Sequence, residues 1–209
     1  IVSAREAEPV AMRFVAAGCH AAVLRYAVAP EAKWPDASLQ LAAAILHVRE
    51  HAQEYHIDPA KVVVAGFSAG GHLAGCAATM SKNRPNAAIL GYPVITSGEF
   101  AHRQSLENVS GEEDPAKQTF WSLETHVSDR TPPAFLWHTY EDDAVPVENS
   151  LLFVSALRRA GVPCEFHLFE KGVHGLSLCN AEVATPMPPT APWIGLCLTW
   201  LSNRFSFEE

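Results

Sequence analysis

The sequence lacks the features that would point to membrane, nucleic-acid or thiol-based metal chemistry. No apolar run is long enough to span a bilayer, and no C-x-x-C pair offers a zinc or dithiol site. Basic residues are few and scattered: 15 Lys and Arg stand against 23 Asp and Glu, for a formal charge of -8. We therefore expect no membrane partner and no nucleic-acid partner.

Cysteine is also scarce, with five residues, an odd number, spaced far apart and mostly within apolar segments. This usage is typical of buried free thiols in a reducing cytoplasm. The chain has no initiator Met, and residues 1–12 hold acidic residues where a secretion signal needs basic and apolar ones. We expect a cytoplasmic protein from which residues upstream of Ile1 are missing.

Apolar runs of β type alternate with longer helical stretches, which predicts an α/β fold with a mainly parallel sheet flanked by helices. The predicted strands are Ala21–Tyr26, Lys61–Phe67, Ala87–Tyr92, Ala134–Thr139 and Glu165–Glu170. The predicted helices are Glu6–Ala17, Asp36–Tyr55 with Asp36 as N-cap, Ala69–Met80, Val147–Ala160 ending at Gly161, and Trp193–Phe205.

Two stretches fit neither pattern. Residues 185–192 hold four prolines and are predicted to form a loop, because proline interrupts both helices and strands. Residues 96–131 are polar and irregular, and we expect them to form a partial cap over the functional site. Without an internal repeat or a linker, residues 1–209 are predicted to form a single domain.

The clearest motif is G-x-S-x-G, present as Gly66-Phe67-Ser68-Ala69-Gly70 between a β-branched strand and an Ala-rich helix. That context predicts a sharp strand-to-helix turn that exposes a nucleophilic serine, Ser68, with Gly66 and Gly70 leaving room for the turn. At the start of a helix, the amide of Ala69 is free to stabilise a developing oxyanion. The alternative is a glycine-rich turn whose serine only caps the helix.

A serine nucleophile needs a base and an acid that orients the base. Two later strands end in loops that offer both groups: Glu141, Asp142 and Asp143 after one strand, and His174 between glycines after the next. Loops at the carboxyl ends of parallel strands meet at one edge of the sheet. We favour Asp142 as the acid, with Asp143 second, and His174 as the base.

Other histidines are given structural roles. His47, Glu50 and His51 match the H-x-x-E-H pattern of a zinc peptidase, but they lie opposite the apolar face of their helix and are predicted to be exposed. His138 lies within a predicted strand and is expected to be a packed core residue. His72 is expected to pack or to form a hydrogen bond close to the turn.

At these residues the sequence resembles the α/β-hydrolase esterase/lipase family, in particular the bacterial branch related to acetyl-xylan esterases and feruloyl-esterase-like proteins. The similar segments include Leu24–Pro30, Ile57–Lys61, Gly66–Ala74, His138–Asn149 and Gly172–Gly175. By this resemblance, Ser68, Asp142 and His174 match the catalytic triad of the family, and Ala69 supplies one oxyanion amide. The resemblance implies a serine carboxylic-ester hydrolase of the α/β-hydrolase fold.

The family also carries strands and a glycine-rich oxyanion loop before its first helix, and both are absent from this chain. Losing one oxyanion donor lowers turnover roughly a hundredfold to a thousandfold. We favour an N-terminally incomplete domain over a degenerate homologue.

We expect the substrate to be a small acyl ester, with an acetyl or short-chain acyl group, carried on a carbohydrate or an aryl alcohol. Phe67, Trp34 and Trp121 are candidate pocket walls. No metal or organic cofactor is needed for this chemistry, and a homodimer is allowed for. The alternatives are a serine peptidase of the same fold and a non-catalytic binding protein that keeps the scaffold.

Overall fold

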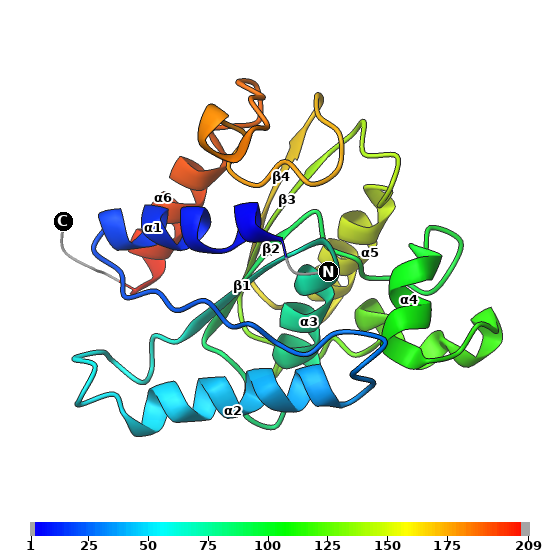
Figure 1. Ribbon diagram of the computed structural model, residues 1–209, viewed down its shortest axis with the longest axis horizontal. Coiled ribbons are helices and arrows are strands. Elements are labelled where there is room, and N and C mark those ends of the chain that lie inside the picture. Colours follow the sequence, from blue (N-terminus) through cyan, green and yellow to red (C-terminus); the bar gives the residue numbers. More distant parts are fainter. Residues whose placement is uncertain (1–2, 206–209) are drawn as a thin grey trace.

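A parallel four-stranded sheet forms the centre of the protein in the computed structural model, which describes residues 3–205 (Figure 1). The strands lie side by side in chain order: β1 Val63–Phe67, β2 Ala87–Gly91, β3 Ala134–Thr139 and β4 Cys164–Phe169. Every neighbouring pair is parallel, as predicted from the alternation of strands and helices. The outermost residues of the predicted 1–209 domain lie outside the described range.

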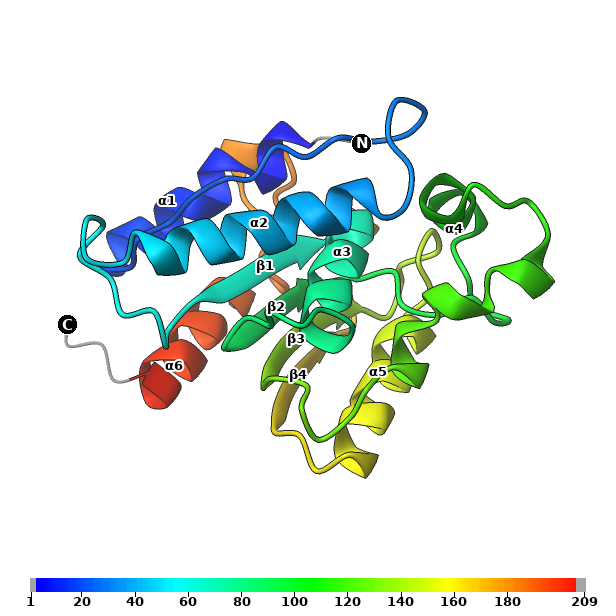
Figure 2. The same ribbon diagram turned by 90° about the horizontal axis from the view of Figure 1, so that it is seen from below.

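Helices cover both faces of the sheet. Their bounds are α1 Glu8–Ala16, α2 Asp36–Glu50, α3 Ser68–Thr79, α4 Arg103–Ser110, α5 Glu148–Arg159 and α6 Trp193–Phe205. Figure 2 shows α6 on one side of the sheet and α3 and α5 on the other. Among the described residues, none of the helices combines the length and apolar character needed to cross a bilayer.

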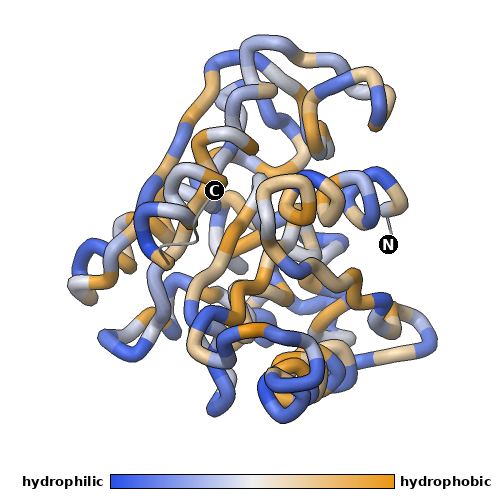
Figure 3. The backbone as a smooth tube through the Cα atoms, turned by 90° about the vertical axis from the view of Figure 1, so that its left-hand side faces the viewer, coloured by the Kyte–Doolittle hydropathy of each residue, from blue (hydrophilic) through white to orange (hydrophobic). Residues whose placement is uncertain are grey.

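Two apolar clusters bind these layers together. The first joins α1 and α6 to one sheet face, with Trp137 and Trp193 stacked at 4.9 Å between ring centroids. The second joins α2, α3 and α5 to the opposite face. Figure 3 shows hydrophobic residues gathered along the central strands and hydrophilic residues mainly in the outer segments. Strands β2 and β3 are buried along their whole length, which explains their nearly continuous apolar sequence.

The prediction of a strand at Ala21–Tyr26 is wrong. This segment is extended, and it runs past α1 and α2 (Figure 1) without pairing with β1 or any other described strand. Its apolar side chains are partly exposed, with Val23 at 38% and Leu24 at 37% of their full accessibility. A β-type composition favours an extended backbone, but a strand also needs a neighbouring backbone with which to pair.

The other four predicted strands and all five predicted helices are confirmed, with their ends moved by a few residues. The largest change is in α2, which ends at Glu50 and continues as turns to His56. Asp36 is the first residue of α2 rather than its N-cap, and its carboxylate accepts a hydrogen bond from the amide of Lys33 at 3.2 Å. Gly161 follows α5 with a positive φ of 70°, as a helix stop requires.

Residues 96–131 are more regular than expected, because they contain α4 and three short 3-10 helices. The side chain of Asn149, at the start of α5, holds the beginning of this segment. Its Oδ1 accepts hydrogen bonds from the amides of Ile95 and Thr96, and its Nδ2 donates to the carbonyls of Phe100 and Pro146. The proline-rich stretch 185–192 forms turns and loop, as predicted.

Candidate active site

Ser68 occupies a strained turn between β1 and α3. Its φ is +53°, a conformation that non-glycine residues rarely adopt. The turn folds so tightly that a Cβ on Gly66 would lie 2.2 Å from the carbonyl oxygen of Gly70. Gly66 is therefore required by the close approach of two backbone segments, as the sequence predicted. This turn places the Ser68 hydroxyl at the start of α3, above the carboxyl end of the sheet.

The second glycine of this turn that has no room for a side chain is Gly71, not Gly70. A Cβ on Gly71 would lie 2.8 Å from Cβ of Pro93, whereas one on Gly70 would meet its nearest neighbour, the hydroxyl of Tyr26, at 3.5 Å. The predicted steric role of Gly70 is therefore wrong. The sequence motif could not reveal the role of Gly71, because Pro93 lies on a loop more than twenty residues away.

His174 bridges Ser68 and Asp142. Its Nε2 lies 2.7 Å from Oγ of Ser68, and its Nδ1 lies 2.7 Å from Oδ2 of Asp142. The three side chains come from the ends of β1, β3 and β4, so the parallel topology brings them to one edge of the sheet. The structure thus brings together the three residues that the sequence singled out, with the histidine between the serine and the carboxylate, an arrangement that can support nucleophilic catalysis.

The neighbours of Asp142 have different surroundings. Asp143 is exposed, whereas the Asp142 side chain is fully buried and faces His174. Glu141 points elsewhere: its carboxylate binds Nζ of Lys171 at 2.6 Å and the amide of Gly172 at 3.2 Å. Glu141 therefore ties the loop that carries the acid to the loop that carries the histidine.

Hydrogen bonds keep the buried Asp142 carboxylate ionised. Burial by itself raises the pKa of this carboxyl, but hydrogen bonds from His138, His174 and the amide of Val145 prevail and hold the pKa below its ordinary value. The amides of Ala144 and Val145 donate to Oδ1 at 3.1 and 2.9 Å. An ionised carboxylate in this place can orient an imidazole and stabilise its protonated form.

The His174 loop rests on Tyr92, whose ring meets the imidazole edge-on at 5.0 Å between centroids. The Tyr92 hydroxyl donates to Glu6 at 2.6 Å and accepts from the amide of Ser177 at 3.0 Å. Burial, followed by the charge of Glu6, raises the pKa of this phenol well above its ordinary value. Tyr92 stays neutral and connects the segment before α1 to the histidine loop.

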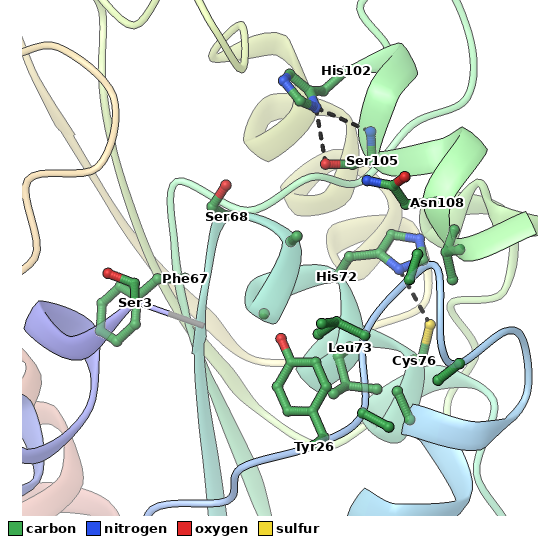
Figure 4. Close-up of a pocket in the computed structure, with 18 of the residues that line it drawn as sticks. Ser3, Tyr26, Phe67, Ser68, His72, Leu73, Cys76, His102, Ser105 and Asn108 are labelled. Atoms are coloured by element: carbon green, nitrogen blue, oxygen red, sulfur yellow. Dashed lines mark hydrogen bonds between the residues drawn. The ribbon is translucent and has the colours of Figure 1, made fainter. Parts of the chain in front are cut away.

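A cleft of about 720 Å³ opens beside Ser68. Figure 4 shows His102, Ser105 and Asn108 of the α4 region on one side of it, and Tyr26, Leu73 and Cys76 on another. The first side is polar and the second mainly apolar. This division suits a ligand that has one polar part and one apolar part, with its reactive group at Ser68 between them.

The expected cap over the site is therefore confirmed as a wall of the cleft, formed by α4 and the residue before it. Burial, followed by the charge of nearby His174, lowers the pKa of His102. The sequence did not single out the polar residues of this wall, because an irregular segment has no periodicity that shows which side chains face inward. Of the predicted walls, Phe67 and Trp34 line the cleft, whereas Trp121 packs against Trp34 behind it.

The zinc-like pattern on α2 does not form a metal site. His47 and Glu50 are exposed, and His47 bonds to the hydroxyl of Tyr55 at 2.9 Å. His51 was also predicted to be exposed but is half-buried, with its ring stacked on that of Tyr55. Within residues 3–205, no three His, Cys, Asp or Glu side chains lie together as metal ligands.

The other two histidines that the sequence singled out, His72 and His138, are buried. His72 packs beneath the turn, and its Nε2 donates to the carbonyl of Trp121 at 2.9 Å. His138 is completely buried, as expected, but it also lies 3.3 Å from Asp142, a contact that the sequence did not indicate.

Comparison with known proteins adds a family relationship. The profile of a family described as alpha/beta hydrolase fold matches residues 2–178. Among curated proteins, the chain is 38% identical over 196 residues to endo-1,4-beta-xylanase B of Butyrivibrio fibrisolvens, covering 85% of this chain and 31% of that protein. It is 40% identical over 136 residues to an acetylxylan esterase of Xylanibacter ruminicola, covering 61% of this chain and 28% of that protein.

A solved structure shares the fold closely. The acetyl ester-xyloside bifunctional hydrolase from Caldicellulosiruptor lactoaceticus superposes with a TM-score of 0.88 and 40% sequence identity, covering 99% of this chain and 79% of that one. The present chain spans less than a third of the two curated relatives named above.

Proposed function

The chain belongs to the alpha/beta hydrolase fold family, and on that premise we propose that it hydrolyses short-chain acyl esters carried on carbohydrate hydroxyl groups. Ser68 is the nucleophile, His174 the general base and acid, and Asp142 the group that orients the imidazole. The observation that carries this proposal is the bridging position of His174, 2.7 Å from both Ser68 and Asp142.

The mechanism is acyl transfer in two steps. Nε2 of His174 takes the proton of the Ser68 hydroxyl while Oγ attacks the ester carbonyl, and the tetrahedral intermediate collapses as the imidazolium protonates the departing alcohol. The acyl group is then bound to Ser68. His174 next removes a proton from water, which attacks the acyl carbonyl, and the acid leaves as Ser68 recovers its proton.

The start of α3 supports stabilisation of the oxyanion. The first amides of a helix have no partner within the helix, and Ala69 follows the nucleophile directly. The Ala69 amide and the positive end of the helix dipole favour negative charge on the carbonyl oxygen during attack. One donor of an oxyanion hole is thus assigned to Ala69.

The cleft supports a carbohydrate ester as substrate. The side chains of Ser105 and Asn108 offer hydroxyl and amide groups to a sugar, while the side formed by Tyr26 and Leu73 suits an acyl group. Two relatives have names that agree with this choice, an acetylxylan esterase and an acetyl ester-xyloside hydrolase. All five cysteines are free thiols, which supports a cytoplasmic location as part of the proposal.

The test compares the full-length protein with its Ser68→Ala variant on p-nitrophenyl acetate and on acetylated xylo-oligosaccharides. We expect Ser68→Ala to lose activity on both substrates. The matched control is Ser155→Ala, an exposed serine on α5, which should keep the parent rate. A parent without activity on either ester would contradict the proposal and favour a peptidase or a binding role, and a Ser68→Ala variant as active as the parent would exclude Ser68 as the nucleophile.

A further inference from the structure

Resting on the proposed function, we infer that His138 is a positioning residue for hydrolysis, which holds the Asp142 carboxylate in place for His174, and that Ser150 holds the orientation of the His138 ring. Neither residue touches the substrate cleft. Their effect on the reaction passes through a single atom, Oδ2 of Asp142.

The hydrogen bonds of His138 fix its tautomer. Nε2 lies 2.9 Å from the carbonyl oxygen of Val145, which can only accept, so Nε2 carries a hydrogen. The same nitrogen lies 3.3 Å from Oδ2 of Asp142, and its N–H is shared between the two acceptors. In the neutral ring Nδ1 then has a lone pair, which accepts from the hydroxyl of Ser150 at 2.8 Å.

This arrangement completes the set of donors around the carboxylate. Two backbone amides, of Ala144 and Val145, bind Oδ1, while two imidazoles, of His174 and His138, bind Oδ2. With the two backbone amides alone, the Asp142 carboxylate can still pivot about Oδ1, and the position of Oδ2 is not fixed. A second donor to Oδ2, in addition to His174, restricts this rotation, so that Oδ2 stays aligned with Nδ1 of His174.

A purely structural role explains the contacts less well. His138 and Ser150 are both completely buried. A buried polar ring is unfavourable unless its nitrogens are paired, and here one of its nitrogens is directed toward the ionised group of the triad. The position of His138, four residues before Asp142, places it under the turn that carries the acid.

The first test replaces His138 by Leu and by Gln in the full-length protein. His138→Leu removes the donor, and we expect kcat on p-nitrophenyl acetate to fall roughly 10-fold to 100-fold, a part of what general base catalysis contributes. KM should change little, because the cleft is untouched. His138→Gln keeps an amide donor near the position of Nε2 and should recover much of the loss.

The pH profile separates positioning from packing. The acid limb of kcat/KM reports deprotonation of His174. Without the His138 donor the charge of Asp142 is less compensated, favours the imidazolium more strongly, and moves this limb to higher pH in His138→Leu. These substitutions leave the other titratable and charged groups around Asp142 and His174 unchanged. Those groups are His102 of α4, Tyr92 after β2, Arg5 beside Gly175, and the ion pair of Glu141 and Lys171.

Two further variants guard against misfolding. Ser150→Ala leaves His138 in place but removes the partner of Nδ1, so the ring is held less firmly in the orientation that presents its Nε2–H to Asp142. We expect a smaller loss of kcat and a shift of the acid limb in the same direction. Leu157→Ala, in the buried part of α5, is the structural control and should lower Tm without moving the acid limb.

The outcomes distinguish this inference from the proposed function. If the parent hydrolyses esters and needs Ser68, but folded His138→Leu and Ser150→Ala keep the parent kcat and the parent acid limb, the positioning role is wrong. If Leu157→Ala moves the acid limb as much as His138→Leu does, the effect is one of packing and the inference is again wrong. A parent without esterase activity contradicts the proposed function itself, before any His138 variant is measured.

Discussion

The hydroxyl of Tyr92 donates a hydrogen bond of 2.6 Å to the carboxylate of Glu6, although 86 residues separate them in the chain. The same oxygen accepts from the amide of Ser177, three residues after His174. One buried phenol therefore fixes the segment before α1 and the histidine loop relative to each other.

Tyr92→Phe is expected to lower both stability and activity. The ring that supports His174 remains, but the amide of Ser177 and the carboxylate of Glu6 lose their partner. A buried donor left without a partner costs about 1 to 3 kcal/mol. We expect a lower unfolding free energy in urea, measured by circular dichroism, and a lower kcat with the nucleophile intact. Tyr92→Phe with the stability of the parent would contradict this account.

Alanine at the three glycines around Ser68 should have unequal effects. Gly66→Ala forces a Cβ into the Gly70 carbonyl at 2.2 Å, and Gly71→Ala places one at 2.8 Å from Pro93. Both should destabilise the protein by about 1 to 3 kcal/mol or more and abolish esterase activity. Gly70→Ala is the matched control, since its nearest contact of 3.5 Å is ordinary. Thermal unfolding with a parallel activity assay ranks the three, and an inactive Gly70→Ala would show that the turn is tighter than described.

Asn108→Ala is expected to affect carbohydrate esters more than aryl esters. Asn108 lines the polar side of the cleft, where the sugar is proposed to bind. One lost hydrogen bond is worth about 0.5 to 1.5 kcal/mol, so KM for acetylated xylo-oligosaccharides should rise roughly 2-fold to 10-fold. Hydrolysis of p-nitrophenyl acetate should stay at the parent level. Glu107→Ala, on the same helix but outside the cleft, provides the comparison, and equal effects of the two variants on KM would argue against a sugar site here.

The buried carboxylate of Asp142 should make stability depend on pH. Its pKa in the folded protein lies below the ordinary value of 3.8, so ionisation stabilises the fold above that value, and this stabilisation is lost as the pH falls toward the folded pKa. Asp142→Asn lacks this contribution. We expect the difference in Tm between the parent and Asp142→Asn to be smaller below about pH 4 than at about pH 5. A difference that grew on acidification would reverse the assigned direction.

The sequence predicted the centre of the protein better than its edges. Strand β3 was predicted with its final bounds because a buried strand in a parallel sheet is apolar throughout. Ala21–Tyr26 has a similar composition, but composition does not show whether a second backbone lies beside it. The sequence singled out Ser68, Asp142 and His174 because each follows a strand or begins a helix in a recognisable motif.

The features that the sequence missed depend on three-dimensional contacts. Gly71 has no room for a side chain because Pro93 lies beside it, and His138 lies 3.3 Å from Asp142 because the chain turns between them. His102, Ser105 and Asn108 lie in a segment without periodicity, where no pattern indicates which side chains face the cleft. Such residues become visible only when the three-dimensional neighbours are known.

The side-chain amide of Asn149 has a consequence for how this scaffold can diversify. It holds both ends of residues 95–100 by three hydrogen bonds, to Ile95, Thr96 and Phe100, at the point where the chain leaves the sheet to build the α4 wall. Because the attachment is made to backbone atoms, it is indifferent to the side chains that follow. Insertions, deletions and exchanges within residues 101–131 can therefore alter which alcohol the proposed site accepts without displacing Ser68, Asp142 or His174, so that selection can act on substrate preference and on turnover separately.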